Sequence, residues 1–175
     1  MIFIFALLFC VGLLFFILPS LSPVPYFPSN HTDTKKIMNA LYSTQSRVYI
    51  DLGAGDGWVV FQAASAALAR NLSIRFILVE INPLLCVLLY VRRFFHPYKR
   101  NIQIVRTDLF TFQIRNYVSR KENVCVYLYI SPWMLKRAIR NIRSQVPDAR
   151  FVTYMYPLAE KAKKTYRGIH TTYVY

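Results

Sequence analysis

Short apolar runs alternate with amphipathic or alanine-rich segments from residue 33 to the end of this 175-residue chain. The apolar runs are rich in Val, Ile, Leu and Tyr, which is typical of buried strands. The segments between them place apolar residues at helical spacing, which predicts helices that cover a sheet. This alternation predicts an α/β protein with a mostly parallel, doubly wound, Rossmann-like sheet. The expected strands are 48–50, 74–79, 102–106, 124–130, 149–156 and 168–175, and the expected helices are 33–43, 58–70, 83–91 and one that begins at Ser131.

The expected helix over residues 83–91, PLLCVLLYV, has no polar face. It is too short to cross a bilayer, and a helix that is apolar all round is typical of a protein interior. We therefore expect it to be buried. Arg92 and Arg93 end the helix, and Lys99 and Arg100 follow it. Because cations suit the carboxyl end of a helix, we expect these four side chains to be solvated.

Residues 1–18, MIFIFALLFCVGLLFFIL, form an uninterrupted apolar run. As a helix the run would measure about 27 Å, which is enough to cross the hydrocarbon core of a membrane. It lacks the basic start and the small-residue cleavage site of a signal peptide. Lys35, Lys36 and Arg47 follow the run and no charged side chain precedes it, so the positive-inside rule places the amino end outside. We expect a single-pass membrane protein whose folded domain lies on the cytoplasmic side.

Residues 19–28, PSLSPVPYFP, contain four prolines, which disfavour a helix or a central strand. One interpretation is a stiff linker that holds the domain close to the bilayer. The other is that Tyr26 and Phe27 cover part of a site in the domain. We therefore divide the chain into a transmembrane anchor (1–19), a proline-rich linker with a pre-domain motif (20–30) and one α/β domain (31–175).

The charge of the chain is unusually positive. Lys and Arg number 22 and Asp and Glu number 8, which gives a formal net charge of +14, and every one of these residues lies after position 32. Such a field favours anionic partners, namely acidic lipid head groups, nucleic acid or an acidic protein surface. The charge alone does not choose among them.

Cysteine and histidine are few and scattered. Cys10, Cys86 and Cys125 lie in apolar runs, their number is odd, and none is part of a C-x-x-C pair. The three histidines, His31, His96 and His170, are similarly scattered. This pattern predicts neither a disulfide framework nor a metal site.

A glycine-rich turn follows the first expected strand. Asp51 ends that strand, and Gly53, Gly55 and Gly57 come at alternate positions before the alanine-rich helix. Glycine permits a sharp turn and leaves no Cβ between the main chain and a ligand. A dinucleotide-binding fingerprint would place its third glycine three residues after the second, where this chain has Trp58. A carboxylate at position 51 would repel a pyrophosphate but suits a cationic ligand. The alternative is an ordinary strand-to-helix turn whose glycines serve packing.

Two more acids follow the next two expected strands. Glu80 comes 23 residues after Gly57, near the roughly 20-residue spacing from the glycine turn to the ribose-binding acid of βαβ nucleotide sites. Asp108 follows the strand over 102–106. The chain has only eight acidic residues, so three of them at one edge of a sheet predict a ligand site. Surface ion pairs are the alternative interpretation.

The acid-first glycine turn resembles motif I, D/E-x-G-x-G-x-G, of the class I S-adenosylmethionine (SAM) methyltransferases. Over residues 24–175 the chain is similar to the small protein-lysine methyltransferases that include the mitochondrial ATP synthase c-subunit lysine methyltransferase and related archaeal and bacterial enzymes. Position 58, often Arg in that family, is Trp here, and no N/D-P-P-[YF] motif follows the fourth strand. The resemblance rests on VPYFPS (24–29), DLGAGDG (51–57), the E-x-N-P of 80–83, the D-L at Asp108, Pro132 and the aromatic terminal strand.

The resemblance implies SAM as the cofactor and methyl transfer to a lysine amine of a protein at or in the membrane. It implies that Asp51 faces the methionine portion of SAM, that Glu80 binds the ribose and that Asp108 lies near the adenine. The expected cofactor-binding residues are Asp51, Gly53, Gly55, Gly57, Glu80, Asn82, Asp108 and Leu109.

The amine acceptor must be neutral to react, and apolar, aromatic walls lower the pKa of an amine by desolvation. Tyr26, Phe27 and Trp133 are the aromatic candidates for such walls, and Ser131 is a candidate for orienting the amine. No general base is expected, because the amine can lose its proton to water. A strongly basic enzyme repels a lysine-rich substrate, so the target is expected to be membrane-embedded or locally acidic. The alternatives are a membrane-tethered RNA methyltransferase or RNA-binding module, which the charge favours, and a non-catalytic membrane anchor with the same fold.

Overall fold

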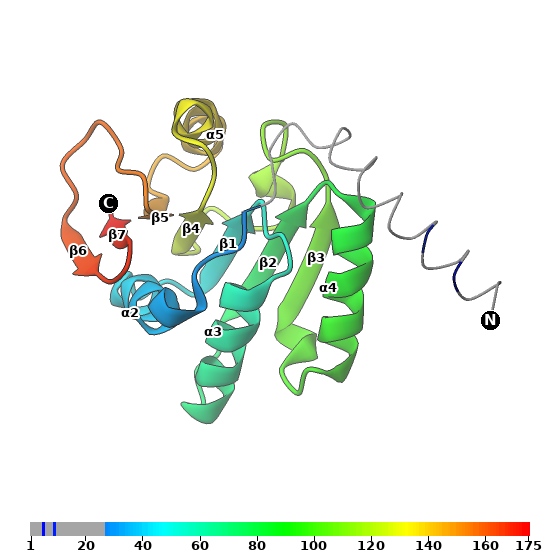
Figure 1. Ribbon diagram of the computed structural model, residues 1–175. Coiled ribbons are helices and arrows are strands. Elements are labelled where there is room, and N and C mark those ends of the chain that lie inside the picture. Colours follow the sequence, from blue (N-terminus) through cyan, green and yellow to red (C-terminus); the bar gives the residue numbers. More distant parts are fainter. Residues whose placement is uncertain (1–4, 6–8, 10–26) are drawn as a thin grey trace.

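The computed structural model describes Phe5, Phe9 and residues 27–175. Apart from those two phenylalanines, the expected anchor (1–19) and the linker up to residue 26 lie outside the described residues. In the part that is described, no helix combines the length and apolar character needed to cross a membrane. Residues 27–175 form one sheet with helices on both faces, which confirms the predicted α/β class (Figure 1).

The sheet has seven strands in the order β3-β2-β1-β4-β5-β7-β6. The first five strands along the chain pair in parallel, and β7 pairs antiparallel with both β5 and β6. The predicted mostly parallel sheet is therefore confirmed. The strands are β1 (Val48–Leu52), β2 (Arg75–Glu80), β3 (Ile102–Arg106), β4 (Val124–Leu128), β5 (Arg150–Tyr154), β6 (Lys164–Arg167) and β7 (Thr171–Val174).

Within residues 27–175, four helices cover the sheet. On one face α2 (Thr34–Ser43), α3 (Trp58–Ala69) and α4 (Pro83–Phe95) share a core cluster with the strands, and on the other face α5 (Pro132–Gln145) belongs to a second cluster. The segment between β3 and β4 packs on the same face as α5. Short 3-10 turns lie at His31–Asp33, Lys99–Asn101 and Ile114–Asn116.

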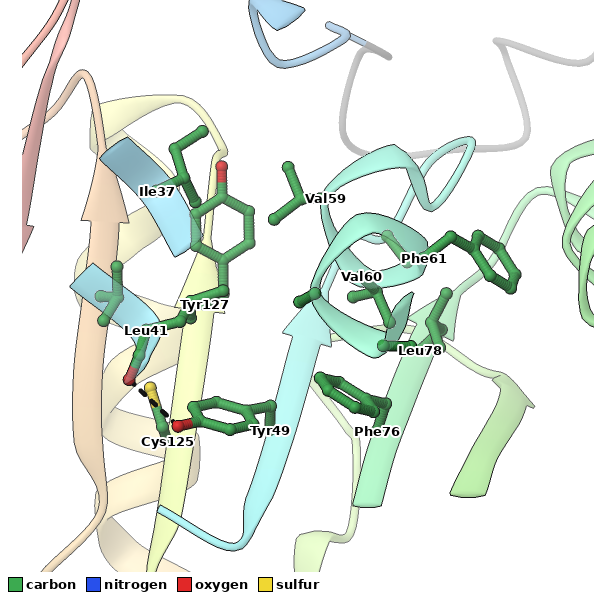
Figure 2. Packing of buried hydrophobic residues seen from close by; sticks show 14 of the residues in the cluster. Ile37, Leu41, Tyr49, Val59, Val60, Phe61, Phe76, Leu78, Cys125 and Tyr127 are labelled. Atoms are coloured by element: carbon green, nitrogen blue, oxygen red, sulfur yellow. Dashed lines mark hydrogen bonds between the residues drawn. The ribbon is translucent and has the colours of Figure 1, made fainter. Parts of the chain in front are cut away.

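The central strands are buried on both faces, which explains their continuous apolar sequence. All five residues of β1 and of β4 are buried. Figure 2 shows the α2 and α3 side of this core, where Tyr49 of β1 lies beside Phe76 of β2. The Tyr49 hydroxyl donates a hydrogen bond of 3.1 Å to the carbonyl oxygen of Leu41 in α2. This bond satisfies a polar atom that would otherwise be unpaired in an apolar cluster.

The expectation that the helix after β2 is buried is wrong. Helix α4 packs beside the edge strand β3, and only a narrow strip of it, with Leu85, Cys86 and Leu89, is buried. Arg92 and Arg93 turn inward instead of being fully solvated. Arg92 donates to the carbonyl oxygen of Asp56, and the Arg93 Nε donates to the carbonyl oxygen of Ile102, both at 2.6 Å. The exposed side is therefore apolar, with Val87, Leu88, Tyr90, Val91, Phe94 and Phe95.

Strand β6 was not predicted from the sequence, which indicated only a basic turn before the last strand. Its residues, KTYR, show no apolar alternation, and three of the four are exposed. It lies at the edge of the sheet and pairs with β7 alone. Charged side chains are common on edge strands, because they discourage pairing with another chain.

Asp33 joins the start of the domain to its end. Its buried carboxylate accepts hydrogen bonds from the Tyr154 hydroxyl at 2.7 Å and from the backbone N–H groups of Ile169 and His170 at 2.8 and 2.7 Å. Burial opposes ionisation, but the bonds from His170, Tyr154 and Ile169 outweigh it, so the pKa of Asp33 is lowered. The segment before β1 is thereby fixed to the carboxyl end of β5 and to the β6–β7 hairpin.

Candidate functional site

The glycine turn begins where β1 ends. Gly53, Gly55 and Gly57 have φ angles of +88°, +57° and +72°, values that residues with a side chain rarely adopt. The N–H groups of Gly53 and Ala54 both donate to the carbonyl oxygen of Val79 in β2, at 2.9 Å. The turn is thus held at the carboxyl ends of β1 and β2, the edge at which open α/β sheets bind ligands.

Gly57 serves packing. A Cβ at this position would lie 2.5 Å from Leu89 Cδ2 of α4 and 2.9 Å from Phe61 Cε2 of α3. Neither distance is possible unless these side chains move. The third glycine therefore lets α3 start close to α4 and to Leu78 of β2, and close packing of helix on strand is also the role of the last glycine in nucleotide-binding turns.

Asp51 is a buried acid at the end of β1. Its side chain lines a pocket over the glycine turn, and the residue is only 5% exposed. Burial raises the pKa of this carboxyl to about 8, and the charges of Glu80 and Asp56 add to the effect. No Lys or Arg among the described residues forms an ion pair with Asp51. A ligand with a positive charge would supply the missing partner.

The pocket over the turn is closed by the pre-domain segment and by β4. Phe27, Pro28 and Ser29 line it from one side, and Tyr127 and Tyr129 line it from the sheet. The Ser29 and Tyr127 hydroxyl oxygens lie 3.1 Å apart, within hydrogen-bonding distance. The pre-domain residues therefore lie over the carboxyl edge of the sheet, against the glycine turn. Tyr26, the other aromatic residue expected here, lies outside the described residues.

Glu80 joins the two loops beside this pocket. One carboxylate oxygen accepts a hydrogen bond from the N–H of Gly55 at 2.8 Å, and the other accepts from the N–H groups of Ile81 and Asn82 at 2.9 and 2.8 Å. The Glu80 side chain thus holds the glycine turn at a fixed distance from the start of α4.

The remaining expected cofactor residues lie around the same edge. Asn82 caps α4, where its Oδ1 accepts from the N–H groups of Leu84 and Leu85. Asp108 follows β3 and its Oδ1 accepts from the N–H of Phe110 at 2.9 Å. Leu109 is buried and approaches Gly53. Asn82 and Asp108 therefore have local backbone roles in addition to any contact with a ligand.

Ser131 and Trp133, the expected residues beside the acceptor, are not part of the pocket lining. Both lie at the start of α5, beyond the carboxyl end of β4. Ser131 is buried, whereas Trp133 is 75% exposed.

Sequence reasoning missed four residues that line the pocket: Tyr127, Tyr129, Asp56 and Trp58. Tyr127 and Tyr129 stand two positions apart in the fourth strand, so both point to the same face of the sheet. That alternation was visible in VCVYLYI. The Trp58 Nε1 donates to Thr34 Oγ1 at 2.9 Å, and its ring stacks on His31 at 4.1 Å. These contacts hold the start of α2 and the turn before it against the glycine turn.

Asp56 connects the turn to α4. Its Oδ2 lies 3.0 Å from Arg92 Nη1, and its Oδ1 accepts from the N–H of Trp58 at 3.1 Å. This pairing leaves Asp51 as the acid that is free to bind a cation in the pocket. Within residues 27–175 and at Phe5 and Phe9, no group of three His, Cys, Asp or Glu side chains is placed to hold a metal ion.

No protein-family model matches this sequence, and no curated protein matches it. Solved structures do match. An RNA methyltransferase from Salinibacter ruber, in complex with S-adenosyl-L-homocysteine (SAH), aligns with a TM-score of 0.65 and 20% identity, over 85% of this chain and 92% of that one. The chain has the fold of SAM-dependent methyltransferases.

Two other methyltransferases show the same likeness. An O-methyltransferase from Bacillus cereus, also in complex with SAH, aligns with a TM-score of 0.60 and 11% identity, over 75% of this chain and 59% of that one. The glycopeptide N-methyltransferase MtfA aligns with a TM-score of 0.54 and 13% identity, over 88% of this chain and 66% of that one. The three differ in their acceptors, and at these identities the likeness shows the fold alone.

Proposed function

We propose that this protein is a SAM-dependent methyltransferase that modifies a lysine amine of a protein at or in the membrane. The observation that carries the proposal is the pocket over the glycine turn, in which a buried carboxylate without a cationic partner faces aromatic side chains. Two of the matched structures hold SAH in the same fold. The finer assignment to protein lysine rests on the resemblance of VPYFPS and the terminal strand to the lysine methyltransferase family.

The residues at the carboxyl edge fit SAM. Asp51 suits the ammonium of its methionine portion, and Gly53 and Gly55 place no Cβ between the main chain and the ligand. The Glu80 oxygen that accepts from Gly55 has a second lone pair, so it can accept a hydrogen bond from a ribose hydroxyl while the carboxylate holds both loops. Asp108, with Asn82 and Leu109 nearby, would border the adenine. When bound, SAM supplies an electrophilic methyl group on a sulfonium.

The protein must deliver a neutral amine to that methyl group. At pH 7 only about one free lysine in 2,500 is neutral, so neutralising it costs roughly 4 to 5 kcal/mol. Phe27, Tyr127 and Tyr129 line the pocket, and with the acceptor bound their rings would shield the amine from water and favour its neutral form. The amine first loses a proton to water, and its nitrogen lone pair then bonds to the methyl carbon. SAM, held by Asp51 and the glycine turn, would supply the methyl carbon to this lone pair and would leave as SAH, with the electron pair of the broken C–S bond on sulfur.

Truncation of the aromatic wall should separate binding from transfer. We expect Phe27→Ala to lower methyl transfer by about tenfold or more while SAM affinity changes by less than about twofold, because the acceptor loses a positioning contact worth roughly 1.4 kcal/mol. Tyr26→Ala should behave in the same way. The assay uses the full chain in detergent, and Ile169→Ala, which removes an exposed apolar side chain between β6 and β7, is the matched control. Full activity of Phe27→Ala and Tyr26→Ala would make this segment a linker, and a parallel loss of SAM binding would place it in the cofactor site.

Residues 1–18 would hold the enzyme in the membrane, with the domain in the cytoplasm, where SAM is made. We expect protease added to intact cells to leave the domain intact, and to digest it once the membrane is permeabilised. A domain that is digested from outside, or a mature chain that begins after Pro19, would contradict this topology.

The acceptor can be found by mass spectrometry of membrane proteins from cells with and without the gene. We expect one or more lysines to carry methyl groups in the presence of the gene only. Recombinant enzyme with SAM should restore the modification in membranes that lack it. If no lysine differs between the two sets of membranes, the lysine assignment is wrong.

An RNA methyltransferase is the second candidate, because the chain carries a net charge of +14 and the S. ruber enzyme that it resembles acts on RNA. This function predicts RNA binding that weakens steeply with salt, together with SAM-dependent methylation of the RNA. Methyl transfer to RNA but to no membrane protein would favour it over the lysine assignment.

A further inference from the structure

Helix α4 exposes a concentration of large apolar side chains. Residues 27–175 contain eleven exposed large hydrophobic residues, and six of them lie on this one helix. They recur at spacings of three and four, so they form a continuous stripe on the side away from the sheet. Single exposed apolar residues are ordinary, but a continuous stripe marks an interaction surface. We call this stripe the outer face: Val87, Leu88, Tyr90, Val91, Phe94 and Phe95.

The two arginines of α4 do not interrupt the outer face. Arg92 binds Asp56 of the glycine turn, and Arg93 binds the backbone of Ile102 at the start of β3. A helix on a water-exposed surface normally places its charges outward. Here they lie along the inner side, and the outward side has no charged residue between Val87 and Phe95.

Positive charges border the outer face at both ends. Lys99 and Arg100 follow the carboxyl end of α4 and are exposed, and the Lys99 Nζ lies 5.2 Å from the centroid of the Phe94 ring. Arg106 is exposed and ends β3, the strand that contacts α4. No Asp or Glu occurs between residues 81 and 107. We call these three cations the basic rim.

We propose that the outer face of α4 and the basic rim dock on an anionic lipid surface. An apolar, aromatic stripe bordered by cations is the pattern of helices that lie in the membrane interface, where rings enter the head-group level and cations meet phosphates. A second copy of this chain would bring two basic rims together. The uncharged residues 1–18 could cover the apolar stripe but would leave the rim without anions. Lipid is the partner that matches both parts.

The position of α4 suits this docking. The helix starts at Asn82, at the same carboxyl edge of the sheet that Phe27 covers. With residues 1–18 in the bilayer, the chain from 19 to 26 keeps Phe27 within about 30 Å of the surface. Docking of α4 would then hold the acceptor pocket beside the membrane. The inference does not depend on methyl transfer, so either proposal can fail without the other.

A fluorescent reporter on the outer face of the full chain tests the proposal. Cys10→Ser leaves Cys86 and Cys125, both buried, and Val91→Cys then provides one exposed site for an NBD label. The labelled protein is reconstituted in phosphatidylcholine vesicles with and without phosphatidylglycerol. Ser144→Cys, an exposed site on α5 across the sheet, is the control label. With anionic lipid, we expect the label at 91 to shift to the blue and to be quenched by doxyl lipids, and the label at 144 to stay in water.

Charge reversal identifies the role of the rim. Lys99→Glu with Arg100→Glu lowers the net charge from +14 to +10, and so does Lys35→Glu with Lys36→Glu on α2. We expect the rim pair to lower the ratio of docked to undocked protein by about tenfold and the α2 pair to leave it near the wild-type value. Three results would overturn the proposal. The first is quenching of the label at 91 by aqueous iodide in anionic vesicles, and the second is a blue shift of this label that is equally large without lipid. The third is an equal effect of the two charge reversals on the ratio of docked to undocked protein. The second result would mean that protein covers the face.

Discussion

An Asp51→Asn protein should bind SAM about a hundredfold or more weakly than the wild type. The side chain lies in the pocket with little exposure, and a charge-assisted hydrogen bond to the ammonium of SAM is worth more there than in water. Asparagine keeps the shape of the residue and removes only the charge, so the packing of β1 is preserved. Calorimetric titration measures the loss. Asp148→Asn, an exposed acid at the amino end of β5, is the control and should bind as the wild type does.

The pH dependence of binding distinguishes this role from a simple packing role. Because the pKa of Asp51 is raised to about 8, the carboxyl is protonated at neutral pH in the free protein and must lose its proton to pair with an ammonium. We expect SAM affinity to rise by up to about tenfold per pH unit from pH 6 towards 8, and to fall above pH 8 as the amino group of SAM loses its proton. Binding near pH 7 should release about one proton, which titration in buffers of different ionisation enthalpy detects.

The raised pKa of Asp51 also makes the free energy of unfolding fall as the pH rises. The folded protein holds a proton on Asp51 that the unfolded chain releases near pH 4, so this contribution is complete at low pH and is lost as pH rises through about 8. Between pH 6 and 8, the free energy of unfolding should fall relative to that of Asp51→Asn, by up to about 1.4 kcal/mol per pH unit. Urea unfolding of both proteins at pH 6 and pH 8 measures this difference. If the difference in the free energy of unfolding is the same at both pH values, and SAM affinity does not change with pH, Asp51 is not the cation site.

The sequence predicted the parts of the fold that depend on local pattern. The central strands β1 and β4 are buried on both faces, and the bounds predicted for β3, 102–106, are those observed. The turn from Asp51 to Gly57 was predicted because positive φ angles and close packing both require glycine at fixed positions. These features depend on neighbours in the sequence, so one chain suffices to find them.

Features that depend on the arrangement of the sheet were not predicted. Helix α4 looks like an interior helix because it has no polar face, but its place beside the edge strand leaves half of it uncovered. The edge strand β6 forms only because β7 offers a partner, and nothing in KTYR indicates a strand. Tyr127 and Asp51 are neighbours because β4 pairs with β1 across more than seventy residues of sequence. Long-range pairing of this kind is invisible to periodicity.

The acids that were predicted to bind the cofactor also accept hydrogen bonds from the backbone of the fold. The spacing that placed Glu80 at the ribose also places it between Gly55 and the start of α4, where it accepts three backbone hydrogen bonds. Asp33 was not singled out, although it is buried and joins the pre-domain segment to β5 and β7. Its partners follow it by more than one hundred residues, so only the folded structure reveals them.

Gly55→Arg should abolish SAM binding. Gly55 is buried in the turn, lines the pocket with Asp51, and has a φ of +57° that disfavours any side chain. An arginine here would fill the space of the ligand and place its guanidinium near the carboxylates of Asp51 and Asp56, where it would take the place of the SAM ammonium. The loss should exceed the hundredfold effect of Asp51→Asn, since both the space and the charge are removed. Calorimetry should show no heat of binding at SAM concentrations that saturate the wild type.

Two further variants exclude a trivial loss of structure. Ala69→Arg adds the same side chain at an exposed position near the end of α3, and SAM should bind it normally. Gly55→Ala carries the backbone strain, about 1 to 2 kcal/mol, but adds only a methyl group. It should therefore bind SAM with an affinity between those of wild type and Gly55→Arg, even if Gly55→Arg itself fails to fold. Heat like that of wild type from a folded Gly55→Arg protein would remove the glycine turn from the cofactor site, and with it the methyltransferase assignment.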